Sequence, residues 1–400
     1  MRGVFERLPR LACPVITIGG TNGKGSTAAM LESIYRAAGY RTGAYFSPHL
    51  VRYNERVRLA GEEVADDVLC EAFASVEEAR GTVPLTYFEF GTLVAFLLFA
   101  RARVDLAILE VGLGGRLDVV NIVDADVSVV VSVGTDHKDL LGPDRETIGR
   151  EKAGIFRAGR PAIIGFDVSE SVVQEARRIG AQARIGGQDF RYEDSGSGLR
   201  FTGTRGTLDL PYPALRGAYQ LANASYALAA TEALAALALT ARDLREGLQA
   251  VRLAGRFQTL PDTGVRTVLD VAHNREAAQA LARTLGEQRV PGRTLAVVGM
   301  LRDKPVAEVF EVLRDSIDTW FLATLDDPRG ADAAFLDDAL QSVGVVAEGL
   351  YDDPLGAYEA ALGRAGPDDR VVVFGSFKTV GAILASRDDR RGGRGGGRVV

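Results

Sequence analysis

A glycine-rich turn near the N-terminus carries the strongest chemical signal in this sequence. Residues 14–27 are PVITIGGTNGKGST, in which an apolar strand enters the turn and a helix leaves it. In such a turn the glycines let backbone N–H groups point inward, and Lys24 can reach the terminal phosphates of a nucleotide. The usual pattern GxxxxGK[ST] is not matched strictly, since Ile18 holds its first glycine position and Gly25 follows the lysine. We interpret the segment as a phosphate loop (P-loop); a plain glycine-rich turn, the alternative, has no need of this lysine.

All three histidines of the chain lie where a strand or turn ends. His49 lies in SPHL, His137 in GTDHKDLLG and His273 in LDVAHN, the last two directly after apolar runs. A single histidine is more often a surface or core residue than a ligand, but α/β proteins place their chemistry at the ends of parallel strands. Their shared setting therefore favours a functional interpretation.

Two further residues could do chemistry, although each has a simpler interpretation. Glu110 ends the apolar run VDLAILE. A carboxylate there is costly to bury unless it meets a cation, either Mg²⁺ on nucleotide phosphates or Arg116 in an ion pair. Lys152 follows Glu151 in a helical pattern. Taken alone, it indicates a surface lysine paired with Glu151 or Glu146.

Alternating apolar runs and helical patterns must position these residues. We predict strands at Val15–Gly20, Val104–Gly112, Val127–Gly134, Pro161–Gly165, Thr267–Ala272, Thr294–Gly299, Thr319–Ala323 and Val371–Gly375. Their Val, Ile and Leu content, with little polar alternation, is typical of parallel strands buried on both faces. Helices are predicted between them, for example at Ser26–Ala38 and Tyr219–Leu239. Strand–helix alternation predicts an α/β fold with doubly wound sheets, interrupted by a small antiparallel excursion at residues 187–213.

The length of 400 residues predicts more than one domain. We expect a P-loop-containing doubly wound domain over residues 1–258 and a smaller Rossmann-like α/β domain over residues 259–386. Residues 387–400, with the sequence RDDRRGGRGGGRVV, are expected to form a disordered basic Gly/Arg tail.

Composition excludes several classes of protein. With 46% hydrophobic and 25% charged residues, the chain is not disordered in bulk. Its longest apolar stretch, Leu93–Ala100, is too short to span a membrane, and the N-terminus has no secretory h-region. Cys13 and Cys70 cannot build a disulfide framework, which favours a reducing cytoplasm. The net charge of −6 disfavours broad nucleic-acid binding.

The sequence resembles the folylpolyglutamate synthase family of the Mur ligase superfamily, and in particular its bifunctional dihydrofolate synthase/folylpolyglutamate synthase members. The resemblance runs in order along nearly the whole chain. It is carried by GTNGKGST, SPHL, TYFEFGTLVAF, EVGLGGRLDVVN, DHKDLLGPDRETIGREKAGIFR, GAYQLANASYAL, GRFQ, LDVAHN, DKP and GSFKTVG. It implies a cytoplasmic, monomeric ATP-dependent ligase whose first domain binds ATP and folate and whose second is a glutamate-ligase domain. The implied partners are folate or dihydropteroate and L-glutamate, and the implied cofactors are ATP and two Mg²⁺ ions, with a monovalent cation as a further candidate.

The resemblance also implies a role for each residue that matches a family motif. The implied ATP-binding residues are Thr21, Asn22, Gly23, Lys24, Gly25, Ser26, Asn223, Arg256 and Asp270. The implied folate-pocket residues are Thr86, Tyr87, Phe88, Glu89, Leu117, Asp118 and Val119. The implied metal ligands are Ser47 and Glu110 for one Mg²⁺, and His137 and Lys152, the lysine as a carbamate, for the other. The implied catalytic residues are Lys24, Lys152 and His273, the last near the incoming glutamate.

The reaction needs residues of these types. Joining a carboxylate to an amine is uphill in water, so ATP must first phosphorylate the acid to an acyl phosphate, which the glutamate amine then attacks. The first step brings two anions together and requires Lys24 and Mg²⁺ to neutralise and align them. A second domain can bring glutamate in and exclude water.

The chain departs from the family pattern at three places. About 18 residues precede the loop, whereas family members carry a longer segment that helps to bind dihydropteroate, so we expect dihydropteroate conversion to be present but weaker. AHNREA replaces AHNPxA and DKP replaces DKD, both with mild expected effects.

Two rival functions remain open at this stage. A Mur-type peptide ligase would share the P-loop, but SPHL and EVGLGGRLD argue against it. A nucleotide-binding protein without ligase chemistry is disfavoured by the intact set Lys24, Glu110, His137 and Lys152.

Overall fold

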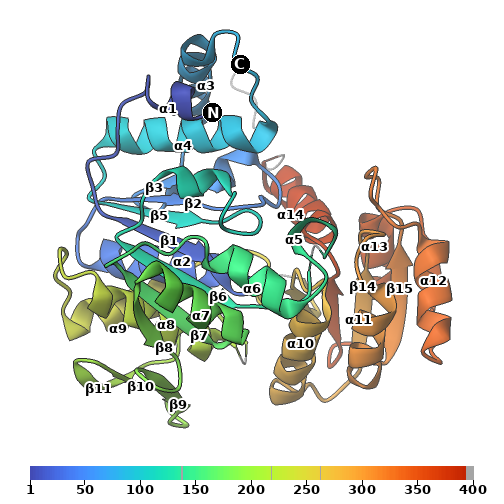
Figure 1. The fold of residues 1–400 in the computed structure, drawn as a ribbon. Coiled ribbons are helices and arrows are strands. Elements are labelled where there is room, and N and C mark those ends of the chain that lie inside the picture. Colours follow the sequence, from blue (N-terminus) through green and yellow to red (C-terminus); the bar gives the residue numbers. More distant parts are fainter. Residues whose placement is uncertain (137, 218, 262, 393–400) are drawn as a thin grey trace, which may run out of the picture. The chain divides into compact units, whose positions relative to one another are not determined.

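The computed structural model describes residues 1–136, 138–217, 219–261 and 263–392. The chain divides into two compact units, the first of Met1–Ala214 with Tyr219–Arg252 and the second of Leu215–Ala218 with Leu253–Val400. Both are α/β units, as predicted (Figure 1).

The first unit is built on an eight-stranded sheet in the order β4-β3-β2-β5-β1-β6-β7-β8. Its strands are β1 (Val15–Gly19), β2 (Thr42–Tyr45), β3 (Val57–Leu59), β4 (Glu62–Glu63), β5 (Leu106–Glu110), β6 (Val127–Ser132), β7 (Pro161–Asp167) and β8 (Gln182–Ile185). From β2 to β8 all neighbours are parallel, and β3 and β4 add an antiparallel edge. Every residue of β1 and β5 is buried, as their unbroken apolar sequences predict.

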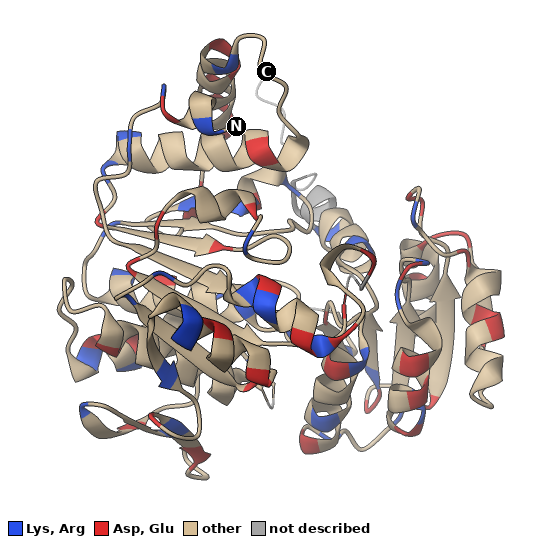
Figure 2. Ribbon diagram, viewed as in Figure 1, with Lys and Arg blue, Asp and Glu red and all other residues tan. Residues whose placement is uncertain are grey.

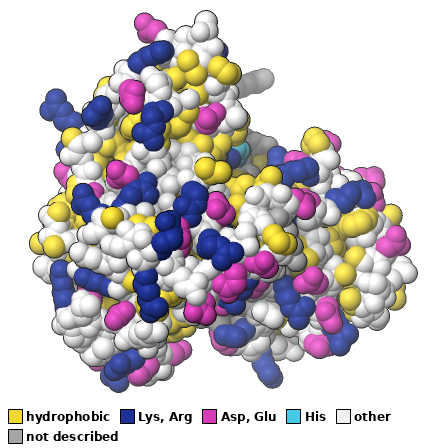
Figure 3. All heavy atoms as spheres, viewed as in Figure 1, with side chains coloured by type: hydrophobic (Ala, Val, Ile, Leu, Met, Phe, Trp, Pro, Cys, Tyr) yellow, Lys and Arg dark blue, Asp and Glu magenta, His cyan; other side chains and the backbone are white. Residues whose placement is uncertain are grey.

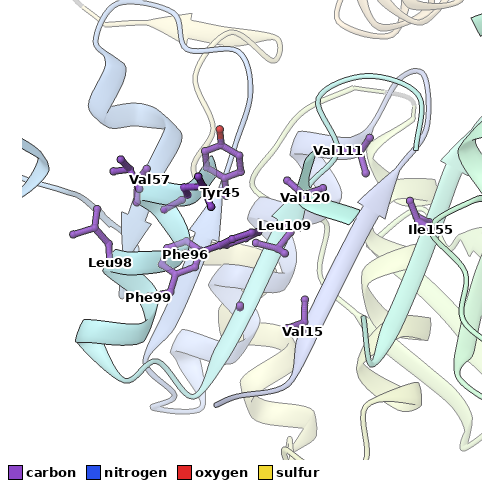
Figure 4. Close-up of a cluster of buried hydrophobic side chains, with 14 of the residues drawn as sticks. Val15, Tyr45, Val57, Phe96, Leu98, Phe99, Leu109, Val111, Val120 and Ile155 are labelled. Atoms are coloured by element: carbon purple, nitrogen blue, oxygen red, sulfur yellow. The ribbon is translucent and has the colours of Figure 1, made fainter. Parts of the chain in front are cut away.

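Helices cover both faces of this sheet, so the unit is doubly wound. One group consists of α2 (Lys24–Ala37), α8 (Gln220–Ala233) and α9 (Ala241–Ala250). The opposite face carries α3 (Asp66–Arg80), α4 (Tyr87–Ala102), α6 (Arg145–Ala153) and α7 (Glu170–Ile179). This unit also contains two short helices, α1 (Arg2–Phe5) and α5 (Lys138–Leu141). Figure 4 shows the core on that second face, where Phe96 and Phe99 of α4 lie against Leu109 of β5.

The antiparallel excursion predicted at residues 187–213 is present. Strands β9 (Arg191–Asp194), β10 (Leu199–Gly203) and β11 (Gly206–Leu210) form a three-stranded antiparallel sheet. It is anchored by aromatic contacts, since the ring of Phe190 lies 6.4 Å from that of Phe201 and 5.4 Å from that of Phe166.

The second unit has a six-stranded sheet in the order β12-β13-β17-β14-β15-β16. Its strands are β12 (Gln258–Leu260), β13 (Arg266–Leu269), β14 (Thr294–Val298), β15 (Thr319–Ala323), β16 (Gly349–Tyr351) and β17 (Arg370–Phe374). Its helices are α10 (Arg275–Glu287), α11 (Val306–Leu313), α12 (Ala333–Ser342), α13 (Pro354–Arg364) and α14 (Phe377–Gly392). Only β12 pairs antiparallel, and the buried Trp320 packs edge-on against Phe310 and Phe374 in the core.

Two predicted segments differ from the structure. The helix predicted over Tyr219–Leu239 ends at Ala233, and Leu234 has left helical geometry. Helix α14 continues to Gly392, so residues 387–392 of the expected disordered tail are helical. Residues 393–400 lie outside the described residues. None of the helices in the described ranges is long and apolar enough to cross a bilayer.

Candidate functional site

The P-loop joins the end of β1 to the start of α2. Gly20 and Gly23 have φ angles of 143° and 97°, which favour glycine. A Cβ atom would also lie 2.4 Å from Val131 Cγ2 at the first position and 2.4 Å from Asn223 Oδ1 at the second. The turn therefore requires glycine at both positions, and it leads into the N-terminus of a 14-residue helix, where unpaired N–H groups favour an anion.

Two lysine amines converge on one carbonyl of this loop. Lys24 Nζ donates to the carbonyl oxygens of Gly20 at 3.1 Å and Thr21 at 3.2 Å. Lys152 Nζ, from α6, donates to the same Gly20 oxygen at 3.1 Å. The structure thus brings together two lysine amines that lie far apart in the sequence.

Lys152 is buried, with 4% of its surface exposed. Burial is the main reason that its pKa falls to about 7, and the charge of Lys24 lowers it further, while Asp136 and Asp118 oppose the shift. The surface interpretation of this lysine is therefore wrong.

The former candidate partners of Lys152 are engaged elsewhere. Glu151 pairs with Arg116 at 3.2 Å, and Glu146 accepts a hydrogen bond from the Ser171 N–H. Arg116 also pairs with Glu175 at 2.7 Å, so the arginine that was the alternative partner of Glu110 points to helices α6 and α7 instead.

Residues from β6 and α8 hold the loop in place. The Ser132 hydroxyl donates to the Asn22 carbonyl at 2.8 Å and accepts from the Asn22 N–H at 3.0 Å. Gln220 Nε2 lies 3.4 Å from the Ser26 hydroxyl, and Asn223 Nδ2 donates to Gln220 Oε1 at 3.0 Å. Asn223 thus lies beside the loop, where the sequence placed an ATP contact.

Glu110 and Ser47 meet at the same edge of the sheet. Glu110 is the last residue of β5, stands in register with Ile18 of β1 and is 5% exposed. Its Oε2 atom accepts a hydrogen bond from the Ser47 N–H at 3.1 Å. A buried carboxylate beside a phosphate loop is a donor of the type that Mg²⁺ prefers.

The residues present fit a magnesium ion that is held mainly by its nucleotide. Within the described ranges, no three His, Cys, Asp or Glu side chains gather closely enough to form a metal cage. Mg²⁺ rarely needs one, since it usually binds one or two protein oxygens together with phosphate and water. Glu110 and Ser47 match that requirement, whereas His137, the predicted ligand of a second ion, lies outside the described residues.

The first predicted folate-binding segment starts helix α4. Thr86 and Glu89 form its capping box: Glu89 N donates to the Thr86 hydroxyl at 3.3 Å, and Thr86 N donates to Glu89 Oε2 at 2.8 Å. Tyr87 is 64% exposed and lies 5.6 Å from the Arg56 guanidinium. Phe88 packs so closely on Gly112 that a Cβ there would lie 2.5 Å from its ring.

The second predicted folate-binding segment, Leu117 to Val119, follows β5. Asp118 accepts hydrogen bonds from the N–H groups of Leu113 at 2.8 Å and Val120 at 3.0 Å, and its burial raises its pKa. It therefore shapes the loop, whereas Leu117 is 89% exposed and able to contact a ligand.

The second unit gathers its three predicted residues at the end of β13. The buried Asp270 accepts from the N–H groups of Phe257 and Ala272, both at 2.9 Å. His273 Nδ1 lies 2.8 Å from the Val271 carbonyl.

Phe377 links the other two side chains of this group. The Arg256 guanidinium lies 5.2 Å from the centre of its ring, and the His273 ring lies 6.4 Å from it. The charge of Arg256 opposes the rise that burial causes in the pKa of Asp270.

Comparison with known proteins places this geometry in a family. The Mur ligase middle domain matches residues 18–231, and the Mur ligase glutamate ligase domain matches residues 255–377. The chain is 45% identical to the Escherichia coli dihydrofolate synthase/folylpolyglutamate synthase over 95% of its own length and 88% of that protein. The chain belongs to the dihydrofolate synthase/folylpolyglutamate synthase family of Mur ligases.

Further comparisons within the dihydrofolate synthase/folylpolyglutamate synthase family agree with this assignment. The folylpolyglutamate synthase of Lacticaseibacillus casei is 31% identical over 92% of this chain and 88% of its own. The structure of E. coli FolC with DHPP and ADP matches with a TM-score of 0.91 at 44% identity, covering 97% of this chain and 92% of that one. The structure of a bifunctional folylpolyglutamate synthase/dihydrofolate synthase with Mn, AMPPNP and L-glutamate bound matches with a TM-score of 0.90 at 42% identity. The match covers 97% of this chain and 94% of that one.

Three residues at the phosphate loop were not predicted as site residues from the sequence. Gly20, Ser132 and Gln220 all contact or form the loop. Gln220 lies three residues before Asn223 and therefore on the same helix face, and Ser132 ends an apolar strand. Both positions could have indicated a residue of the site.

Proposed function

We propose that this chain adds L-glutamate to reduced folates, and also to dihydropteroate, with ATP as the phosphoryl donor and an acyl phosphate as the intermediate. The observation that carries the proposal is the convergence of Lys24 and Lys152 on the Gly20 carbonyl, beside the buried carboxylate of Glu110. Lys24 provides positive charge on the phosphate loop, the Lys152 amine lies beside it, and the Glu110 carboxylate is a hard oxygen ligand; this combination suits phosphoryl transfer. The comparisons support the substrates, since relatives at 44% and 42% identity are described with DHPP, a nucleotide and L-glutamate bound.

Lys24 and the N-terminus of α2 act in the first step. Both provide positive charge before the reaction starts, so they stabilise the transferred phosphoryl group without reorganising. Asn22, Gly23, Gly25 and Ser26 present the backbone and hydroxyl groups of the same turn. The Thr21 hydroxyl accepts a hydrogen bond from the Gly134 N–H at 2.9 Å and so ties the turn to the end of β6. Glu110 and Ser47 would hold one Mg²⁺ ion, and His137 and carbamylated Lys152 would hold a second; the bound ions would neutralise charge on the phosphates.

The second unit serves the attack of the glutamate amine. The Val271 carbonyl can only accept, so His273 Nδ1 donates the hydrogen bond between them, which leaves Nε2 as the other ring nitrogen that can face a ligand. We assign Nε2 the role of orienting the amine, and Arg256 and Asp270 the role of contacting ATP. On this view residues 1–258 bind ATP and folate, and residues 259–386 bring in glutamate.

The two segments around Phe88 and Asp118 hold the folate. Tyr87, Phe88 and Leu117 offer apolar and aromatic surface to the pterin, while Thr86, Glu89 and Asp118 fix the backbone that carries them. Val119 begins the short helix η2 (Val119–Ile122) that Asp118 caps. We place the protein in the cytoplasm, where its free cysteines Cys13 and Cys70 remain reduced.

One assay tests the whole proposal. The purified protein is incubated with Mg²⁺, ATP and L-glutamate, and with either tetrahydrofolate or dihydropteroate, and the products are weighed by mass spectrometry. A gain of one glutamate residue on each substrate is the expected result. ATP hydrolysis that is independent of both would contradict the proposal and favour a nucleotide-binding protein; product from tetrahydrofolate alone would restrict it to polyglutamate synthesis.

A further inference from the structure

Arg116 makes a set of contacts that the proposed chemistry does not use. It lies in the loop between β5 and η2, one residue before Leu117, and its side chain is 38% exposed. Its Nη2 atom donates to Glu175 at 2.7 Å and to the Arg150 carbonyl at 3.1 Å, and its Nε atom donates to Glu151 at 3.2 Å. Figure 2 shows charged residues of both signs gathered on α6 and α7, and Figure 3 shows them at the surface there.

The backbone of Arg116 contacts the same helix end. Its N–H donates to the Glu151 carbonyl at 2.8 Å. Asn121 Nδ2 then bridges the loop and the helix, donating to the carbonyls of Arg116 at 3.0 Å and Gly154 at 3.1 Å. The last carbonyls of a helix have no i+4 partner within it. The Glu151 carbonyl also accepts from the Gly154 N–H at 3.2 Å, so Arg116 and Asn121 add further donors to this end of α6.

Steric fit makes this junction tight. A Cβ atom on Gly115 would lie 2.7 Å from the carbonyl oxygens of Glu151 and Lys152. A Cβ atom on Gly154 would lie 2.4 Å from the Cβ of Arg116. The loop and the last turn of α6 are therefore in direct contact on both sides of Arg116, with no room for an added methyl group.

We propose that Arg116 is a positioning residue for Lys152. The guanidinium caps the C-terminal turn of α6, where a cation also interacts favourably with the helix dipole, and so fixes the turn from which Lys152 reaches Gly20. The same loop carries the proposed folate residues Leu117 and Asp118, so one residue aligns the substrate loop with the buried lysine. This inference rests on the proposed role of Lys152 in ligation.

Arg178 provides a matched control. Its guanidinium also binds Glu175, with Nε and Nη2 each at 2.7 Å from the carboxylate. It lies on α7, and among the residues that the structure describes its side chain donates hydrogen bonds to Glu175 alone. Arg178→Ala therefore removes a comparable ion pair, while the contacts of Arg116 with α6 remain.

The test compares Arg116→Ala, Arg116→Lys and Arg178→Ala by two readouts, backbone hydrogen exchange over residues 150–156 and steady-state ligation kinetics. For Arg116→Ala we expect exchange in this segment to accelerate about tenfold or more, and kcat to fall about tenfold to a hundredfold with the KM for L-glutamate little changed. Arg116→Lys, which keeps the charge but has no fork of donors, is expected to lie between Arg116→Ala and the wild type. Arg178→Ala is expected to match the wild type in both readouts.

Other outcomes are equally informative. Wild-type exchange and kcat in Arg116→Ala would overturn the inference, as would equal changes in Arg116→Ala and Arg178→Ala. If Arg116→Ala does not fold, the inference is tested with Arg116→Lys instead: wild-type exchange and kcat in that variant would overturn it. Lys152→Ala, measured alongside, separates the two proposals: full activity in that variant contradicts the function of Lys152, whereas the exchange data still report on the contact between Arg116 and α6.

Discussion

Lys24 and Lys152 donate to the same atom, the carbonyl oxygen of Gly20, each at 3.1 Å. Two amines on one carbonyl repel each other when both are charged, and burial disfavours the charged form of Lys152 further. The arrangement therefore keeps Lys24 as the cation for phosphate and Lys152 as a ready source of neutral amine. The predictions below test this division of roles and the groups around it.

Lys24→Ala should lose ligation while the fold is retained. Removing one preorganised donor from the transition state typically lowers kcat by roughly a hundredfold to a thousandfold. Arg36→Ala is the control on the same helix, because the Arg36 side chain is 41% exposed and its ion pair with Glu62 is long, at 3.9 Å. Circular dichroism and steady-state kinetics provide the measurements, and near-normal turnover in Lys24→Ala would remove the P-loop assignment.

Glu110→Gln should raise the Mg²⁺ concentration needed for half-maximal activity by about tenfold or more, since a neutral amide is a poorer ligand for a hard cation. The amide oxygen can still accept from Ser47 N, so the fold should persist. Glu32→Gln is the matched control: Glu32 is another buried carboxylate of this unit, 3% exposed, and pairs with Arg58. Overlapping magnesium titrations of Glu110→Gln and the wild type would make Glu110 purely structural.

The histidine predicted as a ligand of the second ion can be tested in the same way. His137→Ala should also raise the magnesium requirement, because it removes one ligand from a site with few protein ligands. An unchanged titration curve would rule out His137 as a ligand.

Lys152→Ala should be nearly inactive, and acetate or another short carboxylic acid should restore part of its activity. The neutral amine adds CO₂ and releases a proton to form a carbamate, whose oxygens a small carboxylate can replace. Lys152→Met is the control, since its side chain fills the space that the added acid would need. Full activity in Lys152→Ala, or equal rescue of both variants, would contradict the carbamate role.

Glu175 should make the first unit more stable at neutral than at acidic pH. Hydrogen bonds from Arg178 and Arg116 lower the pKa of Glu175 from 4.5 to about 2, against the opposing effect of burial. The stabilisation is complete above the unfolded-state pKa near 4.5 and is lost as the pH falls toward 2. Because both arginines are partly exposed, we expect about 1–3 kcal/mol.

The measurement is the difference in free energy of unfolding between the wild type and Glu175→Gln, followed by chemical denaturation from pH 7 to pH 2.5. The difference should shrink steadily below pH 4.5. A constant difference across this range would show that Glu175 acts through packing alone.

Much of the fold could be predicted from local sequence. The unbroken apolar runs at β1, β5, β6 and β14 predicted parallel strands buried on both faces. The predicted and observed bounds of these strands agree to within a few residues. Short strands such as β2, β8 and β16 were missed, because three or four residues carry too little periodicity. The sequence also determined the phosphate loop, since glycines flanking Lys24 between a strand and a helix let backbone N–H groups and the lysine face a phosphate.

Only the tertiary structure decided which side chains meet. Nothing local distinguishes Lys152 from a surface lysine, and its burial results from the packing of α6 against the loop after β5. Likewise, Arg116 follows Glu110 closely in the chain but binds Glu151 and Glu175, because the intervening loop turns toward α6 and α7. Sequence periodicity reports whether a residue faces a core, whereas the partner of a charged side chain depends on crossovers that bring distant segments to one edge of the sheet.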